Sequence, residues 1–304
     1  MGALPARDKL PPMDVRIVDR AREEGYERLT VSLAVEHATQ EEVSRVTAYL
    51  YVPLDIRADE RRPGVLALHP THRIGKGVVD GQSDRPNRGY ARELAQRGYV
   101  VIAPDYPSFG DLAGYDFASD QYVSGTMKGI VNHMRCVDLL VARKDVDPAR
   151  LGVIGHSLGG HNAMFVAAFD VRLKVVVSSC GWTPFHDYYS GDIRGWTSDR
   201  YMPRLRDVYE MNPDKVPFDF HEVVAALAPR VFFSNSPLHD GNFDVQGVRK
   251  AVAEARKVYN LLHAGDRLQV RHPDAGHDFP PAVRREAYQV MDRTFGHQPT
   301  RPAP

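Results

Sequence analysis

A Gly-x-Ser-x-Gly motif at residues 155–159 constrains the fold of this chain more than any other feature. It directly follows an apolar, strand-like run at 151–154 and is followed at 161–169 by a segment compatible with a helix. A strand that turns into a helix within so few residues forces the turn residue, Ser157, into a strained backbone conformation. The flanking glycines leave room for such a turn because they lack a Cβ. The motif in this context predicts a serine hydroxyl held up at the carboxyl edge of a sheet.

Strand-like and helix-like segments alternate from residue 64 onward, which predicts an α/β fold with a mostly parallel central sheet and helices on both faces. Two earlier segments, 29–37 and 43–52, alternate apolar and polar residues and predict an antiparallel hairpin at the start of the sheet. The later strands are expected at 65–68, 99–103, 151–154, 174–178, 231–234 and 267–271, and the helices at 87–97, 120–142, 161–169, 244–262 and 281–295.

The expected domain organisation is a single domain over residues 29–304, preceded by an N-terminal arm at 1–28 that is rich in proline and charge. One long interruption, at about 181–228, separates two predicted strands and contains both tryptophans. A loop this long within a compact domain is usually functional, and we interpret it as a cap over the site. Candidate substrate contacts in it are Trp182, Tyr188 and Trp196. An equally open alternative is that its aromatic residues pack a small core of their own.

The composition is that of a soluble globular protein, with 39 Lys plus Arg against 39 Asp plus Glu. This balance offers no electrostatic reason to expect a nucleic acid or an anionic membrane as partner. No apolar run is long enough to span a bilayer, and residues 1–12 lack the apolar core of a signal peptide. The compartment stays open between the cytoplasm and export with loss of a leader, and so does the oligomeric state. Cys136 and Cys180 are interpreted as small buried side chains.

A serine hydroxyl becomes a nucleophile when a neighbouring base, usually a histidine oriented by a buried carboxylate, removes its proton. In this strand–turn–helix arrangement the acid and then the histidine follow the serine, each after a later strand. His277 lies in the loop after the strand at 267–271 and is the predicted base. Asp240 follows the strand at 231–234 and is the preferred acid. Asp244 is the alternative, although it is well placed to cap the next helix.

The oxyanion formed during acyl transfer needs preorganised N–H donors. The backbone N–H of Leu158, directly after the serine, is expected to be one of them. The second is expected from Thr71 or His72 in the loop after the strand at 65–68, since Pro70 has no N–H. His69 and His72 lack a third ligand at a recognisable spacing, so no metal is expected, and the chemistry needs no cofactor.

Taken together, these motifs resemble the α/β-hydrolase superfamily, in particular the branch of dienelactone hydrolases and prolyl-oligopeptidase-like serine esterases. The resemblance covers about residues 45–296 and is carried by the segments 64–69, 98–106, 145–150, 155–160 and 276–278. It implies a mostly parallel sheet with an antiparallel start, Ser157 as nucleophile, His277 as base and an aspartate as orienting acid.

Several departures limit what the resemblance implies. Dienelactone hydrolases proper use cysteine where this chain has Ser157. Prolyl oligopeptidases carry a large propeller domain, and the 304 residues of this chain are too few to include one. Glucuronoyl and acetyl-xylan esterases are similar in part. The former typically place an arginine near the elbow serine, where this chain has Leu158, Gly159 and Gly160, which disfavours a glucuronate ester, although the arginines of the segment 181–228 keep it open.

The sequence predicts a serine carboxylic-ester hydrolase that acts through an acyl-enzyme on a small-molecule or carbohydrate ester. Its rate is expected to rise with pH around a midpoint of about 6 to 7, as the histidine base becomes neutral. An amidase or peptidase using the same residues is the alternative, and a non-catalytic binding protein on the same fold is the third possibility. The physiological ester is not specified by the sequence.

Overall fold

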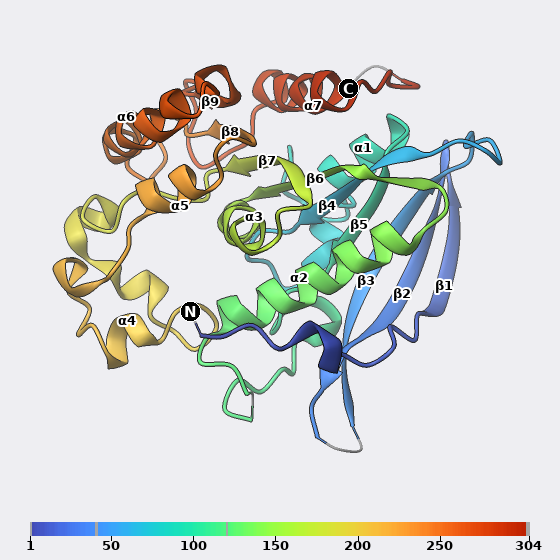
Figure 1. Cartoon of the computed structure of the whole chain (residues 1–304), viewed down its shortest axis with the longest axis horizontal. Coiled ribbons are helices and arrows are strands. Elements are labelled where there is room, and N and C mark those ends of the chain that lie inside the picture. The colour runs from blue at the N-terminus through green and yellow to red at the C-terminus, as the bar shows by residue number, and fades with distance from the viewer. Residues whose placement is uncertain (1, 40–41, 120, 302–304) are drawn as a thin grey trace.

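The computed structural model describes residues 2–39, 42–119 and 121–301, and its centre is a nine-stranded sheet in the order β1-β2-β3-β5-β4-β6-β7-β8-β9 (Figure 1). The pairs β1–β2, β2–β3 and β3–β5 are antiparallel, whereas every pair from β5 through β9 is parallel. This confirms the predicted fold class. The strands are β1 (Arg16–Glu23), β2 (Tyr26–His37), β3 (Val43–Pro53), β4 (Arg62–Leu68), β5 (Val100–Pro104), β6 (Val146–His156), β7 (Leu173–Ser179), β8 (Val231–Asn235) and β9 (Leu268–Arg271).

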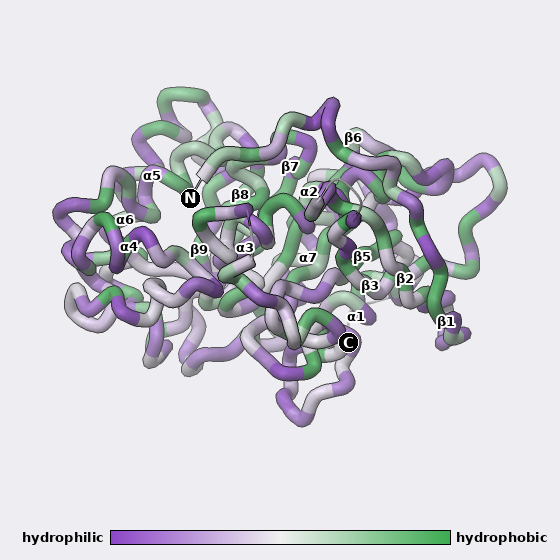
Figure 2. Tube along the Cα trace, turned by 90° about the horizontal axis from the view of Figure 1, so that it is seen from below, coloured by the Kyte–Doolittle hydropathy of each residue, from purple (hydrophilic) through white to green (hydrophobic). Residues whose placement is uncertain are grey.

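Helices cover both faces of the sheet, so the parallel strands are buried on both of their faces. Along β4, Leu66 and Leu68 belong to the core on one face. Val65 and Ala67 belong to the core on the other face, as the alternation of side chains along a strand requires. Figure 2 shows hydrophobic residues along the central strands and also in several outer segments. The first face carries α2 (Gly125–Ala142), α3 (Leu158–Phe169), α5 (Phe220–Ala226) and α6 (Val245–Leu261), and the second carries α1 (Tyr90–Gln96) and α7 (Pro281–Phe295).

The strands and helices expected from the sequence are present, with boundaries shifted by a few residues. Helix α2 begins at Gly125 because the Ser124 hydroxyl accepts the backbone N–H of Met127 and caps it. Its expected start, residue 120, lies outside the described residues. Strand β1 lies within the stretch interpreted as an irregular arm. It is an edge strand whose side chains are mostly exposed, so it lacks the burial-driven alternation that makes a strand visible in a sequence.

The segment between β7 and β8 contains α4 (Arg204–Asp207), α5 and several short 3-10 turns. Its aromatic side chains pack with α3 into a small core. The ring of His161 lies against Phe165 and Trp196, with centroids 4.5 and 4.6 Å away, and 6.0 Å from Phe220. Both ring nitrogens of His161 are buried without a hydrogen-bond partner among the described residues.

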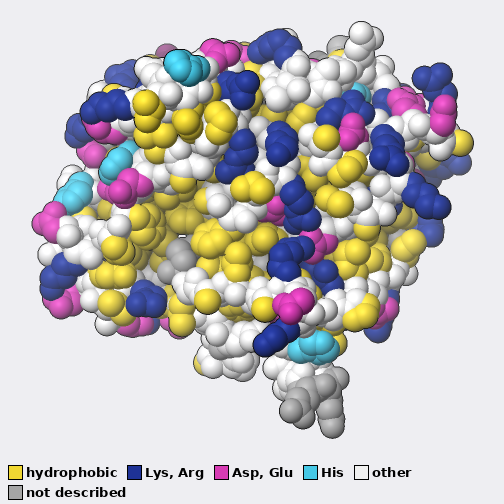
Figure 3. Space-filling model, in the orientation of Figure 1, with side chains coloured by type: hydrophobic (Ala, Val, Ile, Leu, Met, Phe, Trp, Pro, Cys, Tyr) yellow, Lys and Arg dark blue, Asp and Glu magenta, His cyan; other side chains and the backbone are white. Residues whose placement is uncertain are grey.

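The surface carries both signs of charge. Lysine and arginine side chains are interspersed with aspartate and glutamate over the face seen in Figure 3, in keeping with 39 residues of each sign. None of the helices in the described part of the chain has the length and apolar character needed to cross a membrane.

Three buried histidines predict that the fold is sensitive to acid. Burial lowers the pKa of His133 and of His161 to about 3, and that of His156 well below its ordinary value. Below about pH 6.5 these rings take up protons in the unfolded chain but not in the folded one. The unfolded state then binds more protons, so the free energy of unfolding falls as the pH decreases from about 6.5 toward 3, by about 1.4 kcal/mol per pH unit for each ring.

Urea titrations at several pH values across this range measure that slope. His161→Phe keeps the aromatic packing and removes one titrating ring, so its slope is expected to be shallower than that of the wild type. A slope identical in both proteins would contradict the assignment of His161 as a neutral buried ring.

Candidate active site

Ser157 lies in the turn between β6 and α3, at the carboxyl edge of the parallel strands. Its φ of 55° and ψ of −121° are strained for a residue with a Cβ, and its N–H donates to the carbonyl of Ser179 at 2.7 Å. Close backbone approaches require the two glycines. A Cβ on Gly155 would lie 2.1 Å from the oxygen of Gly159, and one on Gly159 would lie 2.0 Å from that of Leu68. The turn therefore has the tight, strained geometry that the motif predicts.

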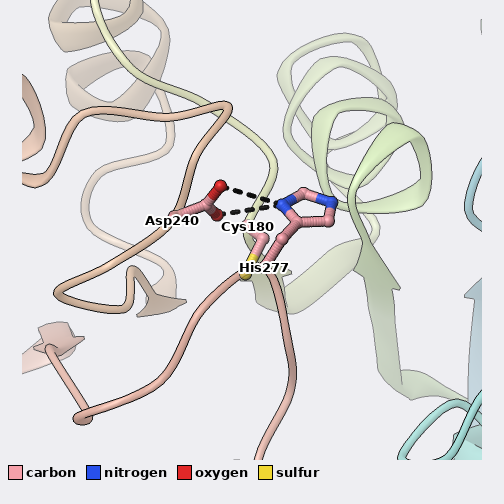
Figure 4. A group of neighbouring side chains, drawn as sticks. All are labelled: Cys180, Asp240 and His277. Atoms are coloured by element: carbon pink, nitrogen blue, oxygen red, sulfur yellow. Dashed lines mark hydrogen bonds and ion pairs between the residues drawn. The ribbon is translucent and has the colours of Figure 1, made fainter.

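His277 and Asp240 come from two other loops at this edge, after β9 and β8 respectively. His277 Nε2 lies 2.9 Å from Ser157 Oγ. His277 Nδ1 lies 3.0 Å from both carboxylate oxygens of Asp240, and Figure 4 draws these two contacts as dashed lines. Because an ionised carboxylate only accepts hydrogen bonds, Nδ1 carries the proton and Nε2 is free to accept the serine proton. We refer to Ser157, His277 and Asp240 as the triad row, since these distances are those of a catalytic triad.

The two ends of the His277 ring meet different environments. The Asp240 side chain is 1% exposed, whereas that of His277 is 25% exposed. Burial raises the pKa of the Asp240 carboxyl, but the hydrogen bond and charge of His277 and the hydrogen bond from the backbone N–H of Asn242 outweigh it and hold this pKa below its ordinary value. Asp240 therefore stays ionised near neutral pH and can stabilise a charged imidazolium.

Asp244, the other aspartate considered for the acid, lies apart from the triad row. Its carboxylate accepts the backbone N–H of Gly247 at 2.8 Å and caps α6. The structure therefore places Asp240, and not Asp244, against the imidazole.

Two backbone N–H groups, those of Leu158 and Thr71, donate to no acceptor among the described residues and lie beside the serine. The ring of His69 orients the second one. Its Nε2 accepts the N–H of Tyr106 at 2.9 Å, so its proton is on Nδ1 and donates to the carbonyl of Pro70 at 2.7 Å. In a trans peptide the N–H points opposite to the C=O, so the N–H of Thr71 points away from His69. This geometry suits an oxyanion hole.

The pocket in front of the serine has a volume of about 160 Å³, and four of its nine lining residues are aromatic. Tyr188 and Trp196, two of the three aromatic residues singled out from the sequence, contribute to it. No charged side chain is present in this lining, which lies wholly within the described residues. The lining residues are Thr71, Ser157, Leu158, Tyr188, Gly195, Trp196, Tyr201, Asn242 and Phe243.

Trp182 and His72, also singled out from the sequence, do not line this pocket. The indole of Trp182 is 1% exposed and stacks on Phe220 in the core, while its N–H donates to Ser234 at 3.1 Å. The His72 ring accepts the N–H of Ile74 at 3.4 Å within its own loop. Thr71 is thus the loop residue that faces the serine.

Two residues that the sequence analysis did not connect with the site hold the loop of His277. Buried Arg88 donates to the His277 carbonyl at 3.1 Å and pairs with Asp278 at 2.5 Å. Cys180, directly after β7, lies 3.2 Å from the carbonyl oxygen of Asp278. The sequence does contain one indication that Cys180 lies near the site. It follows a predicted strand and therefore lies at the same edge of the sheet as the serine.

Among the described residues, one group of three potential metal ligands lies together, namely Cys180, Asp240 and His277. Its histidine and aspartate are already bonded to each other in the triad row. His156, which directly precedes the serine, does not belong to this group. Its ring is hydrogen-bonded to the hydroxyl of Ser179 at 2.9 Å.

The sheet topology and this site define an α/β-hydrolase. Residues 89–295 match the model of the Prolyl oligopeptidase family, and the chain belongs to that family. It is 28% identical over 308 residues to the "Putative hydrolase YtaP" of Bacillus subtilis (strain 168), covering 96% of this chain and 95% of that protein. It is 24% identical over 282 residues to carbohydrate esterase MZ0003 from an unknown prokaryotic organism, covering 76% and 63%.

Among solved structures, the fold is similar to a glucuronoyl esterase from Solibacter usitatus, with a TM-score of 0.72 and 20% identity over 97% of this chain and 89% of that one. The chain is thus a hydrolase with esterases among its relatives, which confirms the resemblance found in the sequence.

Proposed function

We propose that this protein is a serine carboxylic-ester hydrolase that works through an acyl-enzyme. Ser157 Oγ attacks the ester carbonyl while His277 Nε2 takes its proton and then delivers it to the leaving alcohol. The N–H groups of Leu158 and Thr71 stabilise the oxyanion, and Asp240 stabilises the imidazolium. Water, deprotonated by the same histidine, then releases the acid and restores the serine.

The observation that carries this proposal is the continuous triad row, with 2.9 Å between Ser157 Oγ and His277 Nε2 and 3.0 Å between His277 Nδ1 and Asp240. A serine with a base at this distance, a buried orienting carboxylate and two free N–H groups has each part that acyl transfer needs. A protein that only bound its ligand would have no use for the strained backbone at Ser157.

The pocket supports a short, uncharged acyl group. Its volume of about 160 Å³ is small for a ligand site, and its uncharged lining offers no partner for a carboxylate on the substrate. Burial raises the pKa of Tyr188 to about 12, so its hydroxyl stays protonated and can donate a hydrogen bond. Trp196 and Phe243 add flat apolar faces. Small-molecule esters and acylated sugars fit this chemistry, in line with the carbohydrate esterase among the relatives.

Turnover of p-nitrophenyl acetate, butyrate and octanoate, compared with the anilides of the same acids, tests the proposal. We expect hydrolysis of the two short esters, at least about tenfold slower hydrolysis of octanoate, and still slower cleavage of the anilides. A fluorophosphonate should label one serine, and peptide mapping should place the label on Ser157. Faster cleavage of the anilides would point to an amidase or peptidase instead. A protein with neither turnover nor labelling would contradict the proposal and favour a binding protein.

A further inference from the structure

Cys180 has a strained backbone beside the serine turn. Strands β6 and β7 pair with His156 opposite Ser179, so Ser157 and Cys180 each follow the same rung of the sheet. Both have a left-handed backbone, with φ of 55° and 48°. A residue with a Cβ adopts this conformation at a cost in free energy, and it persists only where surrounding contacts enforce it. Two side chains are thus held on strained turns at one edge of the sheet.

The Cys180 side chain lies close to the buried end of the triad row. Its Sγ, a carboxylate oxygen of Asp240 and Nδ1 of His277 all lie within 4.8 Å of one another, and Figure 4 shows the three side chains together. The sulfur is 3.2 Å from the carbonyl oxygen of Asp278 and accepts the amide N–H of Asn235 at 3.7 Å. Cys180 is 2% exposed, so water does not compete for these contacts.

The thiol keeps its proton in this position. Burial and the neighbouring charge of Asp240 raise the pKa of the Cys180 thiol well above its ordinary value, so Cys180 is a donor near neutral pH. The Oδ1 atom of Asp240 accepts the backbone N–H groups of Asn242 and Phe243, at 2.9 and 3.3 Å, from its own loop. The thiol approaches the carboxylate from a different element, the end of β7.

We propose that Cys180 is a positioning residue of this site, whose S–H group is shared between the carboxylate of Asp240 and the carbonyl of Asp278 and holds the acid in place behind His277. The proposal builds on the proposed function, because the acid matters through the base that it orients. It also links the loops that carry Asp240 and His277 through one side chain of a third strand.

The thiol has a consequence for the pH dependence. A hydrogen-bond donor withdraws negative charge from the Asp240 carboxylate. Without the Cys180 thiol, the carboxylate would stabilise the charged form of the His277 ring more strongly. His277 would then keep its proton to a higher pH. The other titratable groups near this ring are neutral or paired. His156 is a buried neutral ring 4.9 Å away, and Arg88 and Asp278 form an ion pair at 2.5 Å whose charges offset each other.

The test compares Cys180→Ala, which removes the donor, with Cys180→Ser, which keeps one. Cys136→Ala, in α2, is the matched control because it removes the other buried thiol, which lies outside the site. The pH profile of kcat/KM for p-nitrophenyl acetate is measured, together with an NMR titration of the His277 ring. For Cys180→Ala we expect kcat to fall about fivefold to thirtyfold, KM to change less than about twofold, and both midpoints to rise by roughly half a pH unit. Cys180→Ser should lie close to the wild type, and Cys136→Ala should match it.

Unchanged midpoints in a folded Cys180→Ala protein would overturn the proposal. Equal losses of kcat in the alanine and serine variants, without a shift, would also overturn it, because they would show that the sulfur only fills space. A wild type without turnover would refute the proposed function, yet the NMR titration would still decide the hydrogen-bonding role, since it needs no substrate.

Discussion

Replacing Ser157 by alanine is expected to lower kcat for p-nitrophenyl acetate by about four orders of magnitude or more, with little change in KM. The substitution removes the Oγ atom that lies 2.9 Å from His277 Nε2 and leaves the pocket walls in place. Substrate therefore still binds, but no acyl-enzyme forms. The residual rate would reflect only the oxyanion donors and the positioning of substrate.

Ser198→Ala provides a matched control, because Ser198 is an exposed serine of the segment between β7 and β8 and does not line the pocket. Its activity should equal that of the wild type. Thermal unfolding of Ser157→Ala should also stay close to that of the wild type, since alanine keeps the Cβ and the backbone N–H that bonds to Ser179. If a folded Ser157→Ala protein kept turning over at a rate near that of the wild type, the nucleophile would have to lie elsewhere.

Asp240→Asn is expected to lower kcat by about three to four orders of magnitude, whereas Asp244→Asn should leave it within about twofold. An asparagine amide at position 240 can donate to His277 Nδ1, which forces the ring proton onto Nε2. A protonated Nε2 cannot accept the proton of Ser157, so the base is disabled although the contacts persist.

The same change at Asp244 acts on a helix cap. Asparagine caps a helix about as well as aspartate, so the hydrogen bond to Gly247 and the stability of α6 should largely survive. Steady-state kinetics of the two variants therefore separate the roles of two aspartates four residues apart. The reverse pattern, with loss of activity only in Asp244→Asn, would refute the assignment of Asp240 as the orienting acid.

Much of this site could be predicted because its chemistry is tied to strand order. The serine motif lies on a strand-to-helix turn, and loops after later strands meet it at the carboxyl edge of a parallel sheet. That rule places His277 and the aspartate pair near Ser157 before any contact is known. It does not choose between Asp240 and Asp244, because a difference of four residues in a loop is decided by how the loop folds.

Three other features escaped the sequence analysis for related reasons. Trp182 and Trp196 are the same residue type, yet Trp182 packs inside the core whereas Trp196 lines the pocket. The sequence does not distinguish these two positions. Strand β1 is mostly exposed, so its composition does not mark it as a strand. Cys180 does not lie in a recognisable motif, and the local sequence does not predict the positive φ of its backbone beside Asp240.

By itself, the sequence determined the α/β architecture, the strained serine turn and the order in which the acid and the base follow it. These depend on residue periodicity and on glycines within a few positions of Ser157, which are local properties of the chain. Only the tertiary structure decided which aspartate meets His277, which N–H groups flank the serine, and which aromatic side chains line the pocket. Those choices depend on contacts between loops far apart in the sequence, whose conformations are set by packing against the sheet and not by their own residues.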